Sequence, residues 1–99
     1  MLIRLHVVVD QEDESLETHI KEKLHAIHPK LSFSPSRPQP SLAHCLEFFA
    51  TARMESDEID AFLKALNNDW DGTRDDCEAY GFNTVMFDSH VYYLQFQIQ

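Results

Sequence analysis

Glycine is scarce in this chain, since only Gly72 and Gly81 occur in 99 residues. Loops that bind phosphate groups need several glycines, because their backbone N–H groups must approach the phosphate closely. The Gly-x-Ser-x-Gly turn that presents a nucleophilic serine is also absent. The sequence therefore excludes a P-loop nucleotide site and gives no sign of a serine hydrolase.

Cationic residues are few as well: eight Lys and Arg stand against seventeen Asp and Glu, for a formal net charge of −9 at pH 7. The eight are scattered, so no basic stripe is available to bind nucleic acid. The aromatic pairs Phe48–Phe49 and Tyr92–Tyr93 are therefore assigned to core and sheet packing rather than to base stacking. Such a charge repels nucleic acid and membrane surfaces and attracts a basic partner.

Long apolar runs and cysteines are lacking too. Apolar runs such as Val7 to Val9 do not exceed four residues, which is far too short to span a bilayer. An acidic block follows the first strand directly, so we expect no signal peptide, which would combine basic, apolar and small-residue regions. Cys45 and Cys77 are expected to be reduced, one or both serving as small hydrophobes. Since 99 residues suffice for a single core, we expect one domain. The short apolar runs and the reduced cysteines further predict a soluble, cytoplasmic protein.

The six histidines and two cysteines do not form a recognised catalytic or metal-binding motif. His25 and His28 are three residues apart near a predicted helix end, where the helix dipole favours a cation. His44, Cys45 and Cys77 could meet in space, but nothing resembles a Cys-x-x-Cys or His-Glu-x-x-His ligand set. We therefore expect no metal, no cofactor and no enzymatic activity.

A calcium loop is a specific alternative for the acidic segment that begins at Asp69. An EF-hand loop requires glycine at its sixth position and a bidentate glutamate at its twelfth. Counted from Asp69, these positions hold Arg74 and Tyr80. The spacing therefore does not match this class of site.

Apolar periodicity predicts strands at both ends of the chain and two helices between them. Residues 2–9 and 91–98 alternate as strands, and one face of 91–98 is wholly apolar, which indicates a central position. Leu16, Ile20, Leu24 and Ile27 form one helical stripe that Pro29 stops, and Ile59, Phe62, Leu63 and Leu66 form a second. Ser56 is the expected cap of the second helix, which Asn67–Asn68 ends.

The remaining segments are less regular. Residues 29–40 contain four prolines, so we expect a loop or at most a short edge strand around Leu31 and Phe33. Residues 41–54 alternate as a strand, although their apolar spacing also fits a helix. Residues 69–76 are expected to be a polar loop. Residues 77–87 are expected to be extended, with Tyr80, Phe82, Val85 and Phe87 as wall residues.

This order of elements predicts an α+β fold with two helices packed on one face of a mainly antiparallel sheet. Ferredoxin-like topology with an extra C-terminal strand is the specific expectation. We further expect the strands at 2–9 and 41–54 to run parallel. Both helix N-termini would then emerge at one end of the sheet and bring the acidic blocks 10–17 and 55–60 together, with the third block, 69–78, at the opposite end.

Most acidic residues belong to these three blocks. Acids at helix starts complement the helix dipole and cap free N–H groups, which accounts for blocks 10–17 and 55–60 without a partner. The third block follows a helix C-terminus, where the dipole disfavours negative charge, so it needs another cause. A solvated loop and a metal site are alternatives to an interface. Trp70 and Tyr80 favour the interface, because aromatic anchors ringed by charge are typical of binding hot spots.

The principal partner-binding surface is therefore predicted in the third block, and a secondary surface at the two helix starts. The principal residues are Asp69, Trp70, Asp71, Asp75, Asp76, Glu78 and Tyr80. The secondary residues are Asp10, Glu12, Asp13, Glu14, Asp57 and Glu58.

Three short motifs near the C-terminus carry a family resemblance: Asp-Trp-Asp-Gly at 69–72, Tyr-Gly-Phe-Asn-Thr at 80–84 and Val-Tyr-Tyr-Leu at 91–94. They resemble the tail of small bacterial immunity proteins, the inhibitors of toxins delivered by contact-dependent growth inhibition and related systems. The Asp-Gly step after a helix is also similar to acidic regulators that bind ribonuclease E. Those regulators carry Trp after that Gly, where Thr73 stands here.

Both resemblances imply a small acidic protein that inhibits a nuclease. The expected function is that of an immunity protein, a stoichiometric inhibitor of a cognate bacterial toxin nuclease such as an RNase. The partner would be a basic protein rather than nucleic acid or a membrane. The alternatives are an acidic regulatory protein of a nucleic-acid enzyme without a toxin, and a small enzyme or metal-binding domain.

Overall fold

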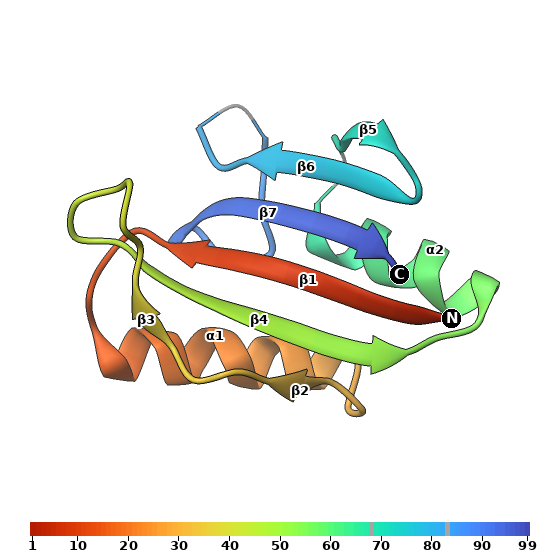
Figure 1. Ribbon diagram of the computed structural model, residues 1–99, viewed down its shortest axis with the longest axis horizontal. Coiled ribbons are helices and arrows are strands. Elements are labelled where there is room, and N and C mark those ends of the chain that lie inside the picture. Colours follow the sequence, from red (N-terminus) through yellow and green to blue (C-terminus); the bar gives the residue numbers. More distant parts are fainter. Residues whose placement is uncertain (68, 83) are drawn as a thin grey trace.

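A computed structural model describes residues 1–67, 69–82 and 84–99. It contains two helices and seven strands, and the elements follow one another along the chain as shown in Figure 1. The order is β1 (Leu2–Val9), α1 (Glu14–Ile27), β2 (Ser32–Phe33), β3 (Arg37–Pro38), β4 (Leu46–Arg53), α2 (Ser56–Leu66), β5 (Asp71–Thr73), β6 (Asp76–Tyr80) and β7 (Val91–Ile98).

The strands form one antiparallel sheet in the order β2-β4-β1-β7-β6-β5, and β3 also pairs with β4. The predicted α+β class with a mainly antiparallel sheet is confirmed. The strand over 91–98 is interior, since β7 lies between β1 and β6. Residues 41–54 contain strand β4, so the helical alternative is wrong there.

The expectation that the strands at 2–9 and 41–54 run parallel is wrong, because β1 and β4 pair antiparallel, with Leu2 opposite Arg53 and Val9 opposite Leu46. Helix α1 carries the chain back along the sheet, so β2 runs in the same direction as β1. The reversal before β4 then makes β4 antiparallel to both. Helices α1 and α2 consequently begin at opposite ends of the sheet.

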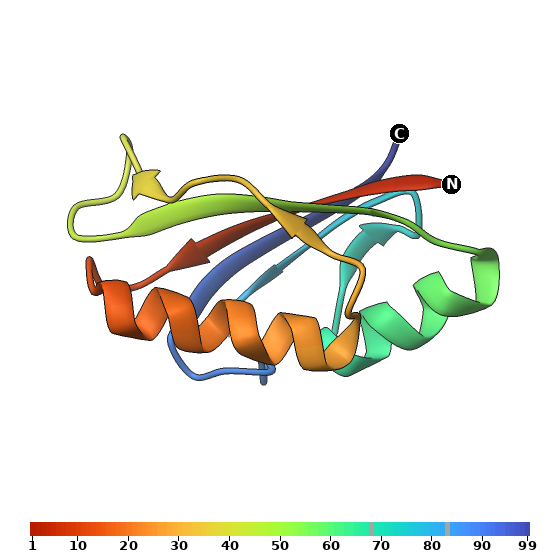
Figure 2. The same cartoon turned by 90° about the horizontal axis from the view of Figure 1, so that it is seen from below.

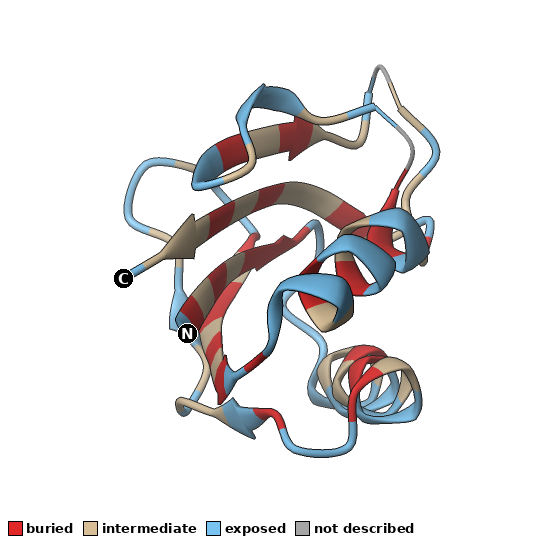
Figure 3. Cartoon of the chain, turned by 90° about the vertical axis from the view of Figure 1, so that its right-hand side faces the viewer, coloured by how far each residue is buried: buried red, intermediate tan, exposed pale blue. Residues whose placement is uncertain are grey.

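Both helices, α1 and α2, lie on the same side of the sheet in Figure 2. The core lies between these layers. Alternating residues of β1, β4 and β7 are buried along the strands, which Figure 3 shows as alternating bands. They pack with the helix stripes in one cluster that includes Ile3, Leu5, Val7, Ile20, Leu24, Phe48, Ile59, Phe62, Leu66, Leu94 and Phe96.

The helix caps arise from local acidic side chains. Asp13 caps α1, since its Oδ1 accepts hydrogen bonds from the N–H groups of Ser15 and Leu16 at 2.9 and 3.3 Å. Glu55, not Ser56, is the N-cap of α2, and its N–H donates to Glu58 at 3.2 Å. The predicted Ser56 cap is wrong because the hydroxyl of Ser56 accepts instead from Arg74, at 2.8 Å.

The irregular segments differ in part from expectation. The proline-rich stretch contributes only the two-residue edge strands β2 and β3. Residues 69–76 are not simply a polar loop, because Asp71–Thr73 forms β5 and pairs with β6. Phe82 and Val85 are 72% and 80% exposed, so they are not wall residues. Asn67 is the C-cap of α2, and the predicted stop at Asn68 lies outside the described residues.

Candidate interaction surface

The third acidic block lies on the β5–β6 hairpin at the edge of the sheet. Gly72 makes the hairpin possible, because its φ of +114° is unfavourable for residues with a side chain. A Cβ atom at this position would also lie 2.5 Å from the carbonyl oxygen of Asp76. The chain reverses at Arg74 and Asp75 and continues directly into β6.

The hairpin places acidic side chains on the sheet face opposite the helices. Asp71 is directly opposite Glu78 in the antiparallel register. Asp76 precedes Glu78 by two residues on β6, so both side chains point to the same face. These three carboxylates and Gln95 of β7 line a hollow of about 330 Å³. Like charges directly opposite each other destabilise a strand pair. This arrangement therefore does not serve the stability of the hairpin.

A second hollow of about 200 Å³ adjoins the first one. Its lining includes Asp69, Trp70, Asp71, Glu78 and Tyr80. The two hollows thus bring together six of the seven residues of the predicted principal surface. The seventh, Asp75, is exposed in the hairpin turn, where its carbonyl oxygen accepts from the N–H of Ile98 at 2.9 Å.

Trp70 is half-buried rather than fully exposed. Its indole Nε1–H donates to the carbonyl oxygen of Leu63 at 2.9 Å, and its ring packs edge-on to Phe96 with centroids 6.5 Å apart. The side chain therefore attaches the start of the hairpin to α2 and to the core. Only the part of the ring that lines the second hollow is available to a partner.

The acidic residues of the hairpin lack cationic partners. Within residues 1–67, 69–82 and 84–99, no Lys, Arg or His forms an ion pair with Asp69, Asp71, Asp75, Asp76 or Glu78. Glu78 accepts a hydrogen bond of 2.7 Å from the Tyr93 hydroxyl. Burial and the hydrogen bond to Glu78 raise the pKa of Tyr93, so this hydroxyl remains a donor. The hairpin therefore presents uncompensated negative charge.

The secondary surface does not form as one unit. Asp10, Glu12, Asp13 and Glu14 lie where β1 ends and α1 begins, whereas Asp57 and Glu58 lie at the start of α2. Because β1 and β4 are antiparallel, these two groups are at opposite ends of the sheet, on the order of 20 Å apart along eight-residue strands. The expectation that they come together is wrong.

Arg74 connects the second acidic block to the third. From the hairpin turn its guanidinium donates to Asp60 Oδ1 at 2.9 Å and to the Ser56 carbonyl oxygen at 2.6 Å. The turn therefore lies beside the N-terminus of α2. The expectation that the third block is remote from the second is wrong as well.

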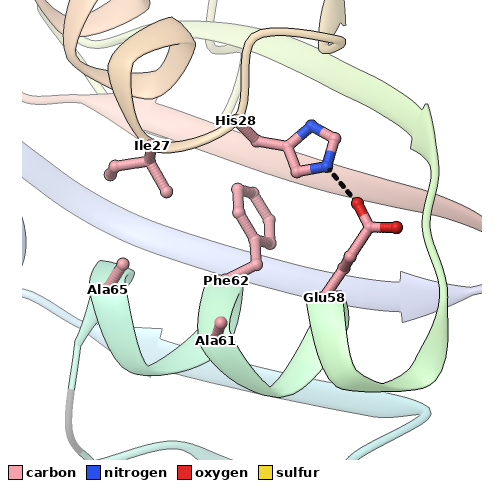
Figure 4. A pocket seen from close by; sticks show the side chains of 6 residues that line it. All are labelled: Ile27, His28, Glu58, Ala61, Phe62 and Ala65. Carbon is pink, nitrogen blue, oxygen red and sulfur yellow. Dashed lines mark hydrogen bonds and ion pairs between the residues drawn. The ribbon is translucent and has the colours of Figure 1, made fainter.

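Glu58 belongs to a separate feature between the helices, shown in Figure 4. Its Oε2 lies 2.9 Å from Nε2 of His28, which follows the end of α1. The hydrogen bond with His28, followed by that from the Glu55 N–H, lowers the pKa of the Glu58 carboxyl. The adjoining hollow of about 400 Å³ is lined mainly by apolar side chains: Ile27, Ala61, Phe62 and Ala65.

Sequence reasoning missed a row of aromatic rings that crosses the face of the sheet opposite the two helices. This aromatic row runs from β4 through β1 and β7 to β6 and the loop that follows. The ring centroids of successive neighbours are 4.6, 6.0, 5.0, 5.3 and 6.4 Å apart. The row consists of Phe49, His6, Tyr93, Tyr80, Phe82 and Tyr92.

A register shift explains why Tyr92 and Tyr93 both belong to the row. Val8 pairs with Tyr93 and Val9 pairs with Val91, so Tyr92 is one extra residue in β7. Both tyrosines line a hollow of about 290 Å³, together with Tyr80, His6 and the 39–42 loop. Strict alternation over 91–98 predicts that Tyr92 shares the apolar face with Leu94 and Phe96, and no sequence pattern marks the bulge.

No group of three His, Cys, Asp or Glu side chains in the part of the chain that the structure describes is arranged to hold a metal ion. Cys45 and Cys77 are free and buried. Burial, and then the Asp76 charge, raise the pKa of the Cys77 thiol to about 11, which disfavours the reactive thiolate.

No helix among the described residues is long and apolar enough to cross a membrane. Comparisons of this chain with models of protein families, with curated proteins and with solved structures found no match.

Proposed function

We propose that this chain is an immunity protein, a small acidic inhibitor that binds and neutralises a basic bacterial toxin nuclease in the cytoplasm. The observation that carries the proposal is the β5–β6 hairpin. It gathers five acidic residues without ion-pair partners among the described residues, beside Tyr80 and the accessible part of Trp70.

The chemistry of a nuclease supports this partner. A nuclease binds a phosphate-rich substrate in a basic cleft, and an exposed acidic edge can occupy such a cleft in place of the substrate. Complementary charge of this kind steers association and raises its rate towards about 10⁸ M⁻¹s⁻¹ at low salt. The net charge of −9 acts in the same direction.

We also propose a ferredoxin-like arrangement for the scaffold. Its support is that β1, α1, β2, β4, α2 and β7 follow a βαββαβ order and that their strands lie side by side as β2-β4-β1-β7. The additional strands would then be the β5–β6 hairpin, inserted between α2 and β7, rather than an appended C-terminal strand. The insertion is the part of the chain that carries the acidic surface.

Co-expression tests the function directly. The chain is produced with the tagged product of the neighbouring upstream gene, or with its nuclease domain alone. We expect a one-to-one complex, restored growth of the expressing cells and loss of nuclease activity at equimolar protein. Failure of every neighbouring product to bind would overturn the proposal. Binding to a housekeeping ribonuclease that is not toxic would favour the regulatory alternative.

A further inference from the structure

Helices α1 and α2 lie on one side of the sheet, as Figure 2 shows, and the aromatic row lies on the other side. Aromatic pairs across strands stabilise a sheet, which accounts for the rings on β1, β4 and β7. It does not account for Phe82, which is 72% exposed in the loop after β6 and belongs to the row through Tyr80 and Tyr92. An exposed phenylalanine that continues a row of aromatic rings extends an apolar patch, and such patches mark contact surfaces.

One end of the row already holds an arginine of this chain. The Arg4 guanidinium carbon lies 4.2 Å from the centroid of the Phe49 ring, over its face. At the other end, no Lys or Arg of the described residues lies over Tyr80, Phe82 or Tyr92. The ring face of Phe49 on β4 is therefore covered by a cation, whereas the ring of Tyr80 on β6 has no such cation among the described residues.

The open end is also the acidic end. Tyr80 is on the same strand face as Glu78 and Asp76, and Glu78 is directly opposite Asp71. The Tyr93 hydroxyl occupies one oxygen of Glu78 and holds the carboxylate beside the ring of Tyr80. A guanidinium group placed here would find a ring face for stacking and carboxylates for bidentate hydrogen bonds.

We infer that the open end of the aromatic row (Tyr80, Phe82 and Tyr92, with Glu78 and Asp71) docks arginine side chains of the basic protein partner. The inference rests on the proposed function in one respect, namely that the partner is basic. It adds the recognition chemistry. Arginine is bound in preference to lysine, because only its planar group both stacks on a ring and pairs with a carboxylate through two hydrogen bonds.

An alternating glycine–arginine octapeptide is a suitable probe, with matched peptides that contain lysine or the uncharged isostere citrulline. Protein NMR spectra are recorded during titration with each peptide. We expect the arginine peptide to shift the aromatic and backbone signals of Tyr80, Phe82 and Tyr92. The lysine peptide should bind more weakly, and the citrulline peptide should produce no shift at the row.

Phe82→Ala is the decisive variant, since removal of an exposed side chain leaves the core intact. It should weaken binding of the arginine peptide about threefold to fivefold, the loss expected for one exposed cation–π contact. Leu2→Ala is the matched control, because Leu2 is also exposed but lies at the start of β1, outside the aromatic row. This variant should bind the arginine peptide as tightly as the unaltered protein does. Equal binding of arginine and citrulline peptides, or an unchanged affinity in Phe82→Ala, would overturn the inference.

Other occupants of this face give different results in the same experiments. A single-stranded oligonucleotide that shifts the row signals more than the arginine peptide does would replace the inference with nucleic-acid binding. Concentration-dependent dimerisation lost in Phe82→Ala would assign the face to a second copy of the chain. The proposed function fails separately: a bound arginine peptide without any inhibited nuclease rejects the function alone, and inhibition unaffected by Phe82→Ala rejects the inference alone.

Discussion

The acidic blocks at 10–17 and at 69–78 have similar composition but different roles in the folded chain. In the first block, Asp13 caps α1, Asp10 lies 3.1 Å from His90, and Glu17 pairs with Lys21 at 2.8 Å. In the third block, the carboxylates stand on a strand pair without cationic partners among the described residues. Helix starts supply N–H groups that satisfy acidic residues, whereas alternate residues of a strand gather like charges on one face.

This difference separates stability from binding. Loss of acidic residues from the first block should reduce the stability of the fold, and loss from the third should reduce affinity for a basic partner. The predictions below follow from this comparison, and the largest expected effect comes first.

Gly72→Val should destroy the third-block surface. Strain at a φ of +114° costs about 1–3 kcal/mol, and the new Cβ would overlap the backbone of Asp76 in addition. We expect a lower midpoint of urea unfolding and loss of partner binding. Opening of the hairpin should also expose Cys77, lower its pKa from about 11 towards the ordinary thiol value of 9.0, and accelerate its alkylation at pH 8.

Thr73→Val is the control for Gly72→Val, since a β-branched residue suits the neighbouring strand position. It should leave unfolding and the alkylation of Cys77 unchanged. If Gly72→Val behaves in the same way, the backbone conformation of the hairpin is not what holds the acidic surface together.

Charge reversal should slow association with the basic partner only when the substituted residue belongs to the third block. Asp71→Lys, and Asp75→Lys with it, should lower the association rate about tenfold at low salt and flatten its dependence on ionic strength. Stopped-flow measurements with the partner check both effects. Glu12→Lys changes the net charge by the same amount as Asp71→Lys at an exposed position of the first block. Equal effects of Asp71→Lys and Glu12→Lys would mean that only the total charge matters.

Trp70→Phe tests whether Trp70 mainly supports the hairpin. The variant keeps most of the packing against Phe96 but removes the hydrogen bond to the Leu63 carbonyl oxygen, which should cost about 1 kcal/mol of stability. Urea unfolding measures this loss. Affinity for the partner should change less than in Asp71→Lys. A large loss of affinity at unchanged stability would make Trp70 a direct contact instead.

Asp13→Ala should lower the thermal midpoint by a few degrees because α1 loses its cap. Hydrogen bonds from the Ser15 hydroxyl, and then from the Leu16 and Ser15 N–H groups, lower the pKa of Asp13 below the ordinary aspartate value of 3.8. The stabilisation from Asp13 is therefore complete above the unfolded pKa and is lost as pH falls through the folded one. Thermal scans should show the difference from Asp13→Ala shrinking below about pH 4. Asp71→Ala, the matched change in the third block, should show no such loss.

Apolar periodicity was sufficient for the regular elements of this fold. Alternation in 2–9 and 91–98 corresponds to β1 and β7, and the two helical stripes correspond to α1 and α2. These elements follow from burial of one face, which the sequence records residue by residue. The direction in which β1 and β4 pair depends on the connections between them, and no pattern within either strand contains that information.

The site could be predicted only in part. The composition of 69–80 located the acidic residues. Gly72 was interpreted as part of a loop, because β5 and β6 are too short to show a clear apolar alternation. Phe82 and Val85 were expected to be packed, since side-chain type alone does not separate a core residue from an exposed contact residue. The aromatic row joins four strands and a loop that are distant in sequence, and only the assembled sheet brings its rings together.

The extra residue in β7 has a consequence for how this surface can vary. Because side chains alternate between the faces of a strand, deletion of Tyr92 would restore regular pairing with β1 while Leu94 and Phe96 stayed in the core. The folded scaffold would persist, with Tyr93 as the one tyrosine that β7 contributes to this face beside Tyr80 of β6. Insertions and deletions at this one position could therefore retune partner choice among related chains without disturbing the packed interior.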